Sequence, residues 1–289
     1  VVFTLPDHLN SIALQHPKIV YKILFDTVWQ TLSAFGNNPK HLGAKMGMIA
    51  VLHTWGQNLS LHPHLHCIVP KGGITKAGYW KQGKAKDDFL FCVKSLSKKI
   101  RGAFVAKLRK ELPGLPQSLY DKLFQKEWIV YAKPPFGKPE NVIEYLGRYT
   151  HKIAIGNHRI LGVDTQNKTV TFGMKNYRNN GKRTTQTLST KEFIRRFQNH
   201  ILPKGFTRIR HYGYLSSAWK KEKLPQLQLL LADKDQGTID VFVCIKKSLN
   251  RSCPSCKTGT LITLLTFDNR GPPKNYKQLV KRKILKYSN

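Results

Sequence analysis

The segment NLSLHPHLHCIVPKGG, residues 58–73, places three histidines at alternate positions of an otherwise apolar run. Alternate residues of a β-strand project from the same face. His64 and His66 are therefore expected to lie side by side on a buried strand, close enough to bind one ligand. Pro63 weakens this expectation for His62, because a proline bends or interrupts a strand. The pattern predicts a metal site, against the alternative of histidines that simply pack in a core or on a surface.

The charge of the chain points to its partner. Of 289 residues, 49 are Lys or Arg and 16 are Asp or Glu, which gives a formal net charge of +33 and a pI of about 10.1. Hydrophobic residues still make up 40% of the chain, as expected of a folded protein that binds a polyanion. The basic residues are spread along the whole chain with aromatic residues between them, which favours DNA over a membrane surface. The sequence predicts no particular oligomeric state.

The five cysteines are too few and too scattered for a secreted disulfide framework, so we predict a reduced, cytoplasmic protein. Cys253 and Cys256 form a CPSC motif, which is half of a zinc knuckle. Zn²⁺ at these cysteines needs further ligands from upstream, such as Cys244 or His211. The alternatives are a reduced turn, or half of a site that a missing segment completes. The chain begins with Val and a strand-like apolar run, so we interpret it as a fragment without its N-terminal part.

Hydrophobic periodicity predicts an α+β fold. The segments expected as strands are 1–6, 46–56, 64–70, 127–133, 158–164 and 169–178, and those expected as helices are 16–35, 95–112, 139–150 and 190–203. Thr190 is expected to cap the last of these helices. This order favours an open, mainly antiparallel sheet with helices on one side. We predict one domain over residues 1–215 and a small extension over residues 216–289, which comprises a leucine-rich helix, the CPSC motif and a basic tail.

The segment EYLGRYTHK places Tyr145 and Tyr149 four residues apart on a predicted helix, so both rings are expected on one helix face. Such a pair commonly packs a helix against a sheet and does nothing else. Its combination with a histidine pair and a strongly basic chain favours a second interpretation, in which the phenols attack a DNA phosphate beside a metal ion. Nearby cations that would help a phenol to lose its proton are Arg148, Lys152 and Lys133.

Four blocks, FTLP, HPHLHCIVPKGG, YLGRYTHKIAIGNHRI and KEFIRRFQNHILPKGFTRIRHYG, follow one another within residues 1–215. Together they resemble the two-tyrosine rolling-circle transposases of the HUH endonuclease superfamily, of the insertion-sequence ninety-one type, in which U is a hydrophobic residue. The resemblance implies a ferredoxin-like antiparallel sheet, the HUH nuclease fold, with the histidine pair on a central strand. It implies that His64 and His66 bind metal and that Tyr145 and Tyr149 are nucleophiles. It further implies a bacterial, nucleoid-associated protein and an N-terminal zinc-binding segment, for which this chain has no cysteines.

The sequence leaves several candidates for the third metal ligand. Gln57 is favoured, because it lies seven residues before His64 on the expected neighbouring strand, and related nucleases use an acidic or amide side chain in a similar place. The alternatives are His62, His53 and His151. An amide oxygen with two imidazoles suits Mg²⁺ or Mn²⁺, whereas an all-histidine set favours Zn²⁺.

These features predict a transposase that cleaves and rejoins mainly single-stranded DNA through tyrosine–DNA 5′-phosphate intermediates in rolling-circle transposition. The phosphate-bond energy is retained in the phosphotyrosine, so the reaction needs no nucleotide cofactor, and the chain contains no GxxxxGK[ST] loop. One alternative is a truncated transposase that binds DNA without turnover. Another is a zinc-dependent hydrolase of phosphate esters that uses water as its nucleophile.

Overall fold

The computed structural model describes residues 1–83, 90–136, 138–150, 153–176, 181–220, 223–232, 251–252, 256 and 260–261. The chain forms two compact units, residues 1–241 and 242–289, which are described separately. In the second unit, β11 (Arg251–Ser252) pairs antiparallel with β12 (Thr260–Leu261). The boundary predicted after residue 215 lies inside the first unit and stays a prediction.

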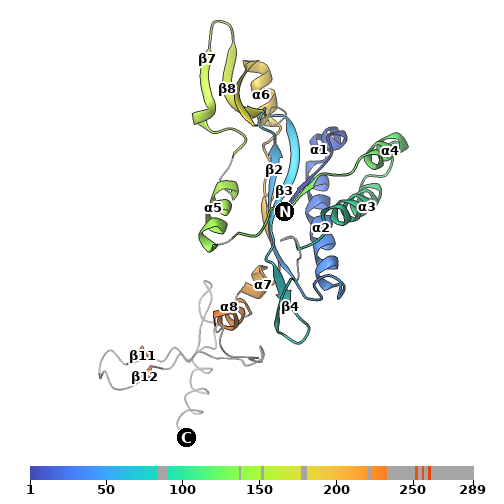
Figure 1. Ribbon diagram of the computed structural model, residues 1–289. Helices are drawn as coiled ribbons and strands as arrows, with labels where there is room; N and C mark the ends of the chain where they lie inside the picture. Colours follow the sequence, from blue (N-terminus) through green and yellow to red (C-terminus); the bar gives the residue numbers. More distant parts are fainter. Residues whose placement is uncertain are drawn as a thin grey trace, which may run out of the picture. The chain divides into compact units, whose positions relative to one another are not determined.

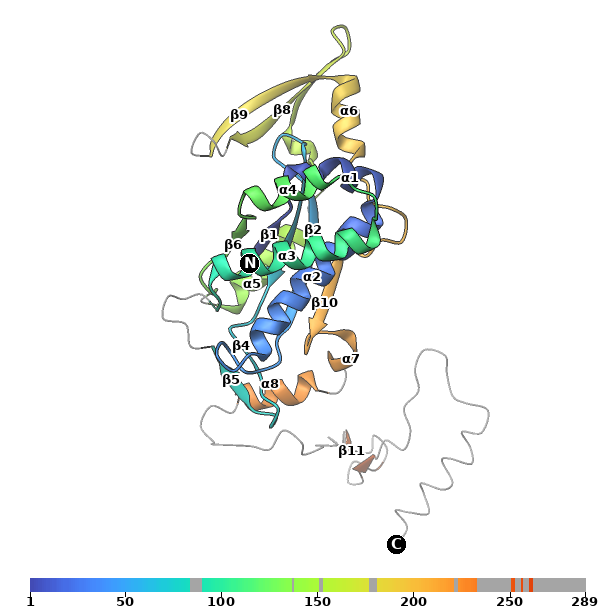
Figure 2. The same ribbon diagram turned by 90° about the vertical axis from the view of Figure 1, so that its right-hand side faces the viewer.

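A five-stranded antiparallel sheet forms the centre of the first unit, in the strand order β10–β2–β3–β1–β6 (Figures 1 and 2). Its strands are β1 (Val2–Thr4), β2 (Gly47–Trp55), β3 (Leu61–Ile68), β6 (Val130–Tyr131) and β10 (Ile209–Gly213). The hairpin formed by β2 and β3 therefore has neighbours on both sides, and β3 is the middle strand. The α+β class and the antiparallel sheet predicted from the sequence are confirmed.

Four helices cover one face of this sheet (Figure 1). They are α1 (Asn10–Gln15), α2 (Pro17–Asn37), α3 (Val93–Glu111) and α4 (Gln117–Gln125), and a short 3₁₀ turn, η1 (Asp7–Leu9), precedes them. Phe3, Leu52 and Leu65 are buried in the core between the sheet and the helices. Because Leu65 faces this core, the strand alternation turns His64 and His66 to the opposite face.

A fifth helix, α5 (Pro139–Thr150), lies on that opposite face, across the sheet from α2 and α3 (Figure 1). It matches the segment predicted to carry the paired tyrosines. Its proline stands at the first helical position, where a missing N–H costs no intrahelical hydrogen bond. The sheet thus separates a helical core from a layer that holds the histidines and the tyrosine helix.

A second, three-stranded antiparallel sheet follows α5, after the 3₁₀ turn η2 (Asn157–Arg159). It contains β7 (Ile160–Asp164), β8 (Thr169–Asn176) and β9 (Lys182–Ser189), and α6 (Thr190–Gln198) follows it. The predicted pairing of the first two strands is confirmed, whereas β9 was not predicted. The prediction that Thr190 caps α6 is wrong: the Ser189 hydroxyl accepts the hydrogen bond from the Glu192 backbone N–H at 3.3 Å, because Thr190 is already the first helical residue.

The remaining elements of the first unit lie at the other end of the central sheet. They are the hairpin of β4 (Gly72–Ile74) and β5 (Trp80–Gln82) and the helices α7 (Ser217–Lys220) and α8 (Leu224–Ala232). Ile74, Tyr214 and Leu227 form a small buried cluster that joins them. Among the described residues, no helix combines the length and the apolar character needed to span a membrane.

Candidate metal and nucleophile site

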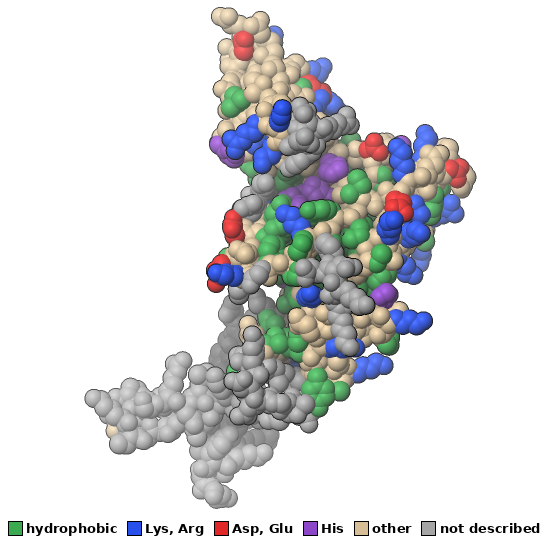
Figure 3. Space-filling view, in the orientation of Figure 1, with side chains coloured by type: hydrophobic (Ala, Val, Ile, Leu, Met, Phe, Trp, Pro, Cys, Tyr) green, Lys and Arg blue, Asp and Glu red, His purple; other side chains and the backbone are tan. Residues whose placement is uncertain are grey.

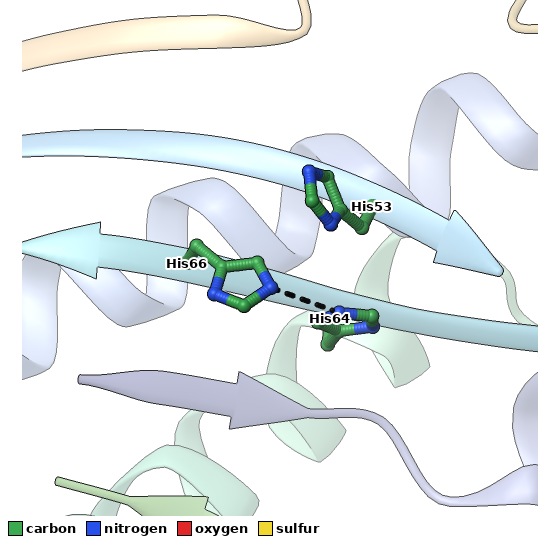
Figure 4. A group of neighbouring side chains, drawn as sticks. All are labelled: His53, His64 and His66. Atoms are coloured by element: carbon green, nitrogen blue, oxygen red, sulfur yellow. Dashed lines mark hydrogen bonds between the residues drawn. The ribbon is translucent and has the colours of Figure 1, made fainter. Parts of the chain in front are cut away.

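Three histidines of the β2–β3 hairpin point toward one another (Figure 4). His53 of β2 and His64 of β3 are direct partners in the strand register, and His66 lies two residues further along β3. One ring nitrogen from each of the three lies within 4.8 Å of the others. In the space-filling view, histidine side chains form a patch on this face, bordered by apolar side chains (Figure 3).

Hydrogen bonds determine which nitrogens of two of these rings carry a proton. His64 Nδ1 lies 2.6 Å from the His62 carbonyl oxygen, and His53 Nε2 lies 2.9 Å from the Tyr149 carbonyl oxygen. A carbonyl oxygen can only accept, so both of these nitrogens donate, and the other nitrogen of each ring keeps its lone pair. Burial lowers the pKa of the His64 imidazole to about 4, so this ring is neutral at neutral pH.

The three imidazoles fit a divalent metal ion. His64 Nε2, which keeps its lone pair, lies 3.2 Å from His66 Nε2, close enough to accept an N–H from it, and a metal ion would take the place of that shared proton. His53 contributes a third nitrogen at the same place. Neutral imidazoles whose second nitrogen donates to a carbonyl are the usual protein ligands of transition metals.

Of the four candidates for the third ligand, the structure describes His53, Gln57 and His62. Gln57 was predicted on the neighbouring strand, and this position is wrong, because β2 ends at Trp55 and Gln57 lies in the turn between the two strands. Its backbone carbonyl accepts a hydrogen bond from Arg159 Nη2 at 2.5 Å. His62 is exposed, with its ring centroid 5.2 Å from that of His64. His151 lies outside the described residues.

Helix α5 brings both tyrosines over the histidines. The Tyr145 hydroxyl lies 2.9 Å from His66 Nδ1, and the Tyr149 ring centroid lies 4.0 Å from that of His66. The two tyrosine rings are 4.3 Å apart, centroid to centroid, on one face of the helix. Burial, with a smaller effect of Tyr149, raises the pKa of the Tyr145 phenol above its ordinary value of 10, so this phenol is protonated at neutral pH.

The C-terminal end of α5 is attached to the central sheet. The last carbonyl groups of a helix lack intrahelical partners and carry partial negative charge. Here the Tyr149 carbonyl accepts from His53, and the Arg208 guanidinium donates to the carbonyls of Tyr149 and Thr150. The same guanidinium lies over the Trp55 ring, 5.9 Å from its centroid. Sequence reasoning did not single out Arg208, although it stands in the block KGFTRIRHYG.

A pocket of about 730 Å³ opens beside the tyrosines. Both tyrosines and His66 line it, together with Lys71, Lys133 and Phe136. The Phe136 ring centroid is 5.3 Å from that of Tyr145. Lys133 is thus at the site, as predicted from the sequence, whereas Lys152 and the Arg148 side chain lie outside what the structure describes. A pocket of this size holds a drug-sized molecule, and therefore also a nucleotide.

The predicted zinc knuckle lies mostly outside the described residues. Cys253 and Cys244 belong to the part that is not described, whereas Cys256 is exposed. His211, the other proposed partner, lies in β10 opposite Ile49. Zn²⁺ at Cys253 and Cys256 therefore stays a prediction.

Comparison with known proteins gives three matches. A family model described as a putative transposase, Y2_Tnp, matches residues 47–223. The chain is 41% identical, over an alignment of 303 positions, to the putative transposase y4qJ of Sinorhizobium fredii (strain NBRC 101917 / NGR234), covering 95% of the chain and 75% of that protein. It is 26% identical over 242 positions to the transposase for insertion sequence element IS801 of Pseudomonas savastanoi pv. phaseolicola, covering 78% of the chain and 56% of that protein. No solved structure gives a significant match.

Proposed function

The chain belongs to the Y2_Tnp putative transposase family, and from this premise we propose that it is a transposase that cleaves and rejoins single DNA strands through tyrosine. One observation carries the proposal: the Tyr145 hydroxyl lies 2.9 Å from Nδ1 of His66, one of the three histidines whose ring nitrogens lie within 4.8 Å of one another. A nucleophile and a metal-binding group that touch each other are what transfer of a DNA phosphate to a side chain requires.

In the proposed reaction, the Tyr145 oxygen attacks the phosphorus of a DNA phosphodiester. The bond from phosphorus to the 3′ oxygen breaks, which leaves a free 3′ hydroxyl and a 5′ phosphate joined to tyrosine. The phenol must lose its proton during the attack, because burial keeps it protonated at neutral pH. This proton passes to solvent in the adjoining pocket, and the departing 3′ oxygen takes one up from solvent to become the hydroxyl. When His66 Nε2 serves as a ligand, Nδ1 carries the proton and donates to the phenol oxygen, which stabilises the negative charge that develops there.

His53, His64 and His66 would hold the divalent ion. When bound, it would neutralise charge on the phosphate and on the departing 3′ oxygen. We propose His53 as the third ligand in place of Gln57, because the strand register sets His53 opposite His64. Imidazole is a poor ligand for Mg²⁺, so an all-histidine site favours Mn²⁺ or Zn²⁺ over Mg²⁺.

Single-stranded DNA is the proposed substrate, and the pocket beside the tyrosines supports it. Phe136 offers a ring on which a base can stack, and Lys71 and Lys133 offer charge to the flanking phosphates. Lys and Arg side chains are distributed over the visible face of the molecule, while acidic side chains are scattered (Figure 3). Two tyrosines on one helix permit two successive strand transfers, as rolling-circle transposition requires.

Covalent capture tests the proposal. The chain is incubated with end-labelled single-stranded DNA and Mn²⁺, and a protein–DNA adduct is sought by denaturing electrophoresis. We expect an adduct, located by mass spectrometry within residues 139–152 and linked through a 5′ phosphate. Tyr145→Phe should reduce the first cleavage more than Tyr149→Phe, and the double variant should form no adduct. Tyr79→Phe, which changes an exposed tyrosine before β5, is the matched control.

The same experiment separates the alternatives. A hydrolase would cut the DNA without an adduct and would be indifferent to both tyrosine changes. A transposase that binds DNA without turnover would retain the DNA and never cut it. A nucleotide found on a residue other than the two tyrosines, or linked through a 3′ phosphate, would refute the proposed chemistry.

A further inference from the structure

The two longest strands of the second sheet, β8 and β9, form a ribbon whose outer face is polar. The strands pair over eight positions. On the inner face Val170 and Phe172 are buried, and Phe172 packs against Phe193 of α6. The outer face carries mainly hydroxyl and basic side chains. Its cross-strand pairs are Thr169–Ser189, Thr171–Thr187, Gly173–Thr185 and Lys175–Arg183. Its β9 members are exposed. Within the sheet, the Thr171 and Thr187 hydroxyls hydrogen-bond to each other at 2.8 Å, whereas the pair of basic side chains has no such partner among the sheet's described residues.

One end of this outer face carries an uncompensated positive charge. Lys175 and Arg183 are direct cross-strand partners, and both side chains are exposed. Like charges directly opposite each other destabilise a sheet. Within the described residues, neither Lys175 nor Arg183 forms an ion pair. Asp164, the one acidic residue between positions 153 and 189, lies at the other end of the sheet, where its carboxylate accepts hydrogen bonds from Asn167. An anion from outside the chain would remove the repulsion.

The ribbon is attached to the hairpin that carries the histidines. Arg159 donates to the Gly173 carbonyl of β8 at 2.9 Å and to the Gln57 carbonyl of the β2–β3 turn at 2.5 Å. Arg196 of α6 donates to the Asn58 carbonyl at 3.1 Å, and His200 Nε2 lies 3.1 Å from the Leu59 carbonyl oxygen. The ribbon therefore extends from the turn end of that hairpin (Figures 1 and 2). A polymer bound along it would have a defined position relative to the tyrosines.

We propose that the outer face of the β8–β9 ribbon binds double-stranded DNA next to the strand that is cut, an inference that rests on the proposed function. A two-stranded antiparallel ribbon fits the major groove of B-DNA. Lys175 and Arg183 contact backbone phosphates, and the threonine hydroxyls and methyl groups meet phosphates and base edges. Surfaces that bind single strands carry aromatic side chains for base stacking, and the described residues of this face include none. The ribbon thus binds the duplex, and the pocket beside Tyr145 binds the single strand.

The test compares two forms of DNA. Affinity is measured by fluorescence anisotropy for a labelled 25-base-pair duplex and for one of its strands alone, at several salt concentrations. For Lys175→Gln/Arg183→Gln we expect duplex affinity to fall on the order of tenfold, and the slope of log affinity against log salt to decrease in magnitude by about 2, as for the loss of two phosphate contacts. Affinity for the single strand and the yield of tyrosine adduct should not change. Lys98→Gln/Lys99→Gln removes two exposed charges from α3 and is the matched control.

A second variant tests the hydroxyl groups. Thr185→Val/Thr187→Val keeps the shape and strand propensity of both side chains and costs only the exposed hydrogen bond between Thr171 and Thr187, so it should fold, weaken duplex binding and leave the salt slope unchanged. Unaltered duplex affinity in both ribbon variants would overturn the inference. So would an equal loss for duplex and single strand, or an equal loss in the α3 control. Duplex binding is measured without cleavage, so absence of a tyrosine adduct in the unmodified chain would count against the proposed function alone.

Discussion

At the scale of single residues, His53 contacts both the tyrosine helix α5 and the histidine pair of β3. Its Nε2 donates to the Tyr149 carbonyl, and one of its ring nitrogens lies within 4.8 Å of ring nitrogens of His64 and His66. The sequence predicted the histidine pair, because alternation along one strand decides which side chains share a face. It favoured Gln57 as the third ligand and left His53, the residue across the hairpin from His64, among the alternatives. Which residue lies across the hairpin depends on the strand register, which here includes an irregularity between His53 and Trp55.

Removal of the histidine pair should separate catalysis from DNA binding. In the variant His64→Ala/His66→Ala, we expect cleavage that depends on a divalent ion to disappear. Affinity for single-stranded DNA should stay within about threefold of that of the unmodified chain, because it depends on many distributed Lys and Arg side chains. Gel assays of cleavage and anisotropy measurements of binding check this. Full cleavage by the double variant would rule out the metal site.

His53 and Gln57 can be compared by the stabilisation that an ion provides. An ion at a hundred times its dissociation constant stabilises a folded protein by about 2.7 kcal/mol, which for a chain of this size raises Tm by roughly 5–10 °C. We expect Mn²⁺ or Zn²⁺ to raise Tm in the unmodified chain and in Gln57→Ala, and His53→Ala to lose most of this shift. The reverse ranking of the two variants would identify Gln57 as the ligand.

The stability of the metal-free protein should depend on pH through His64. Burial lowers the pKa of this imidazole from its ordinary value of 6.5 to about 4. Below pH 6.5 the unfolded chain therefore binds a proton that the folded chain does not, and the free energy of unfolding decreases as the pH falls toward 4, by at most about 3 kcal/mol. Urea denaturation in EDTA measures this, and His64→Gln should remove that part of the pH dependence. An identical pH profile for the variant would contradict the assignment.

At the scale of elements, hydrophobic periodicity predicted α2, α3, α5 and α6 and six of the strands, whereas several elements, among them β9, β10 and α4, were not predicted. The strand β9 has the sequence KRTTQTLS, in which neither face shows the apolar alternation that identifies a strand. It forms because it pairs with β8 along its full length. The helix α4 did carry a signal, since Tyr120 and Leu123 are three residues apart and buried, but it is a short element. The sequence did not determine where α5 packs, because its contact with the histidines joins residues that are far apart in the chain.

Arg208 should position α5 for the reaction. Its guanidinium holds the carbonyls at the end of this helix, so Arg208→Gln should slow adduct formation at saturating DNA by about 10- to 100-fold, as expected when a nucleophile is misplaced. DNA affinity and Tm should change little, and Arg208→Lys should restore part of the rate. Single-turnover kinetics measure this. Arg195→Gln, at an exposed position of α6, is the control, and an equal effect there would contradict a positioning role.

At the scale of the whole molecule, the charge of +33 should govern how strongly the protein binds DNA. With about 6–10 phosphate contacts to a single strand, log affinity should fall with log salt with a slope of about −4 to −7. Anisotropy titrations from low to moderate salt measure the slope. An affinity that does not vary with salt would mean that the charge serves another purpose.

The distance of 4.3 Å between the tyrosine rings has a consequence for the direction of the proposed reaction. Each transfer exchanges one phosphodiester bond for another of similar energy, so it is close to thermoneutral and reversible. A strand end attached to one tyrosine is held beside the other at an effective concentration far above that of any DNA free in solution. Rejoining therefore competes strongly with release of the ends. The net direction of strand exchange is then set by which 3′ hydroxyl occupies the pocket, a matter of competition between DNA ends.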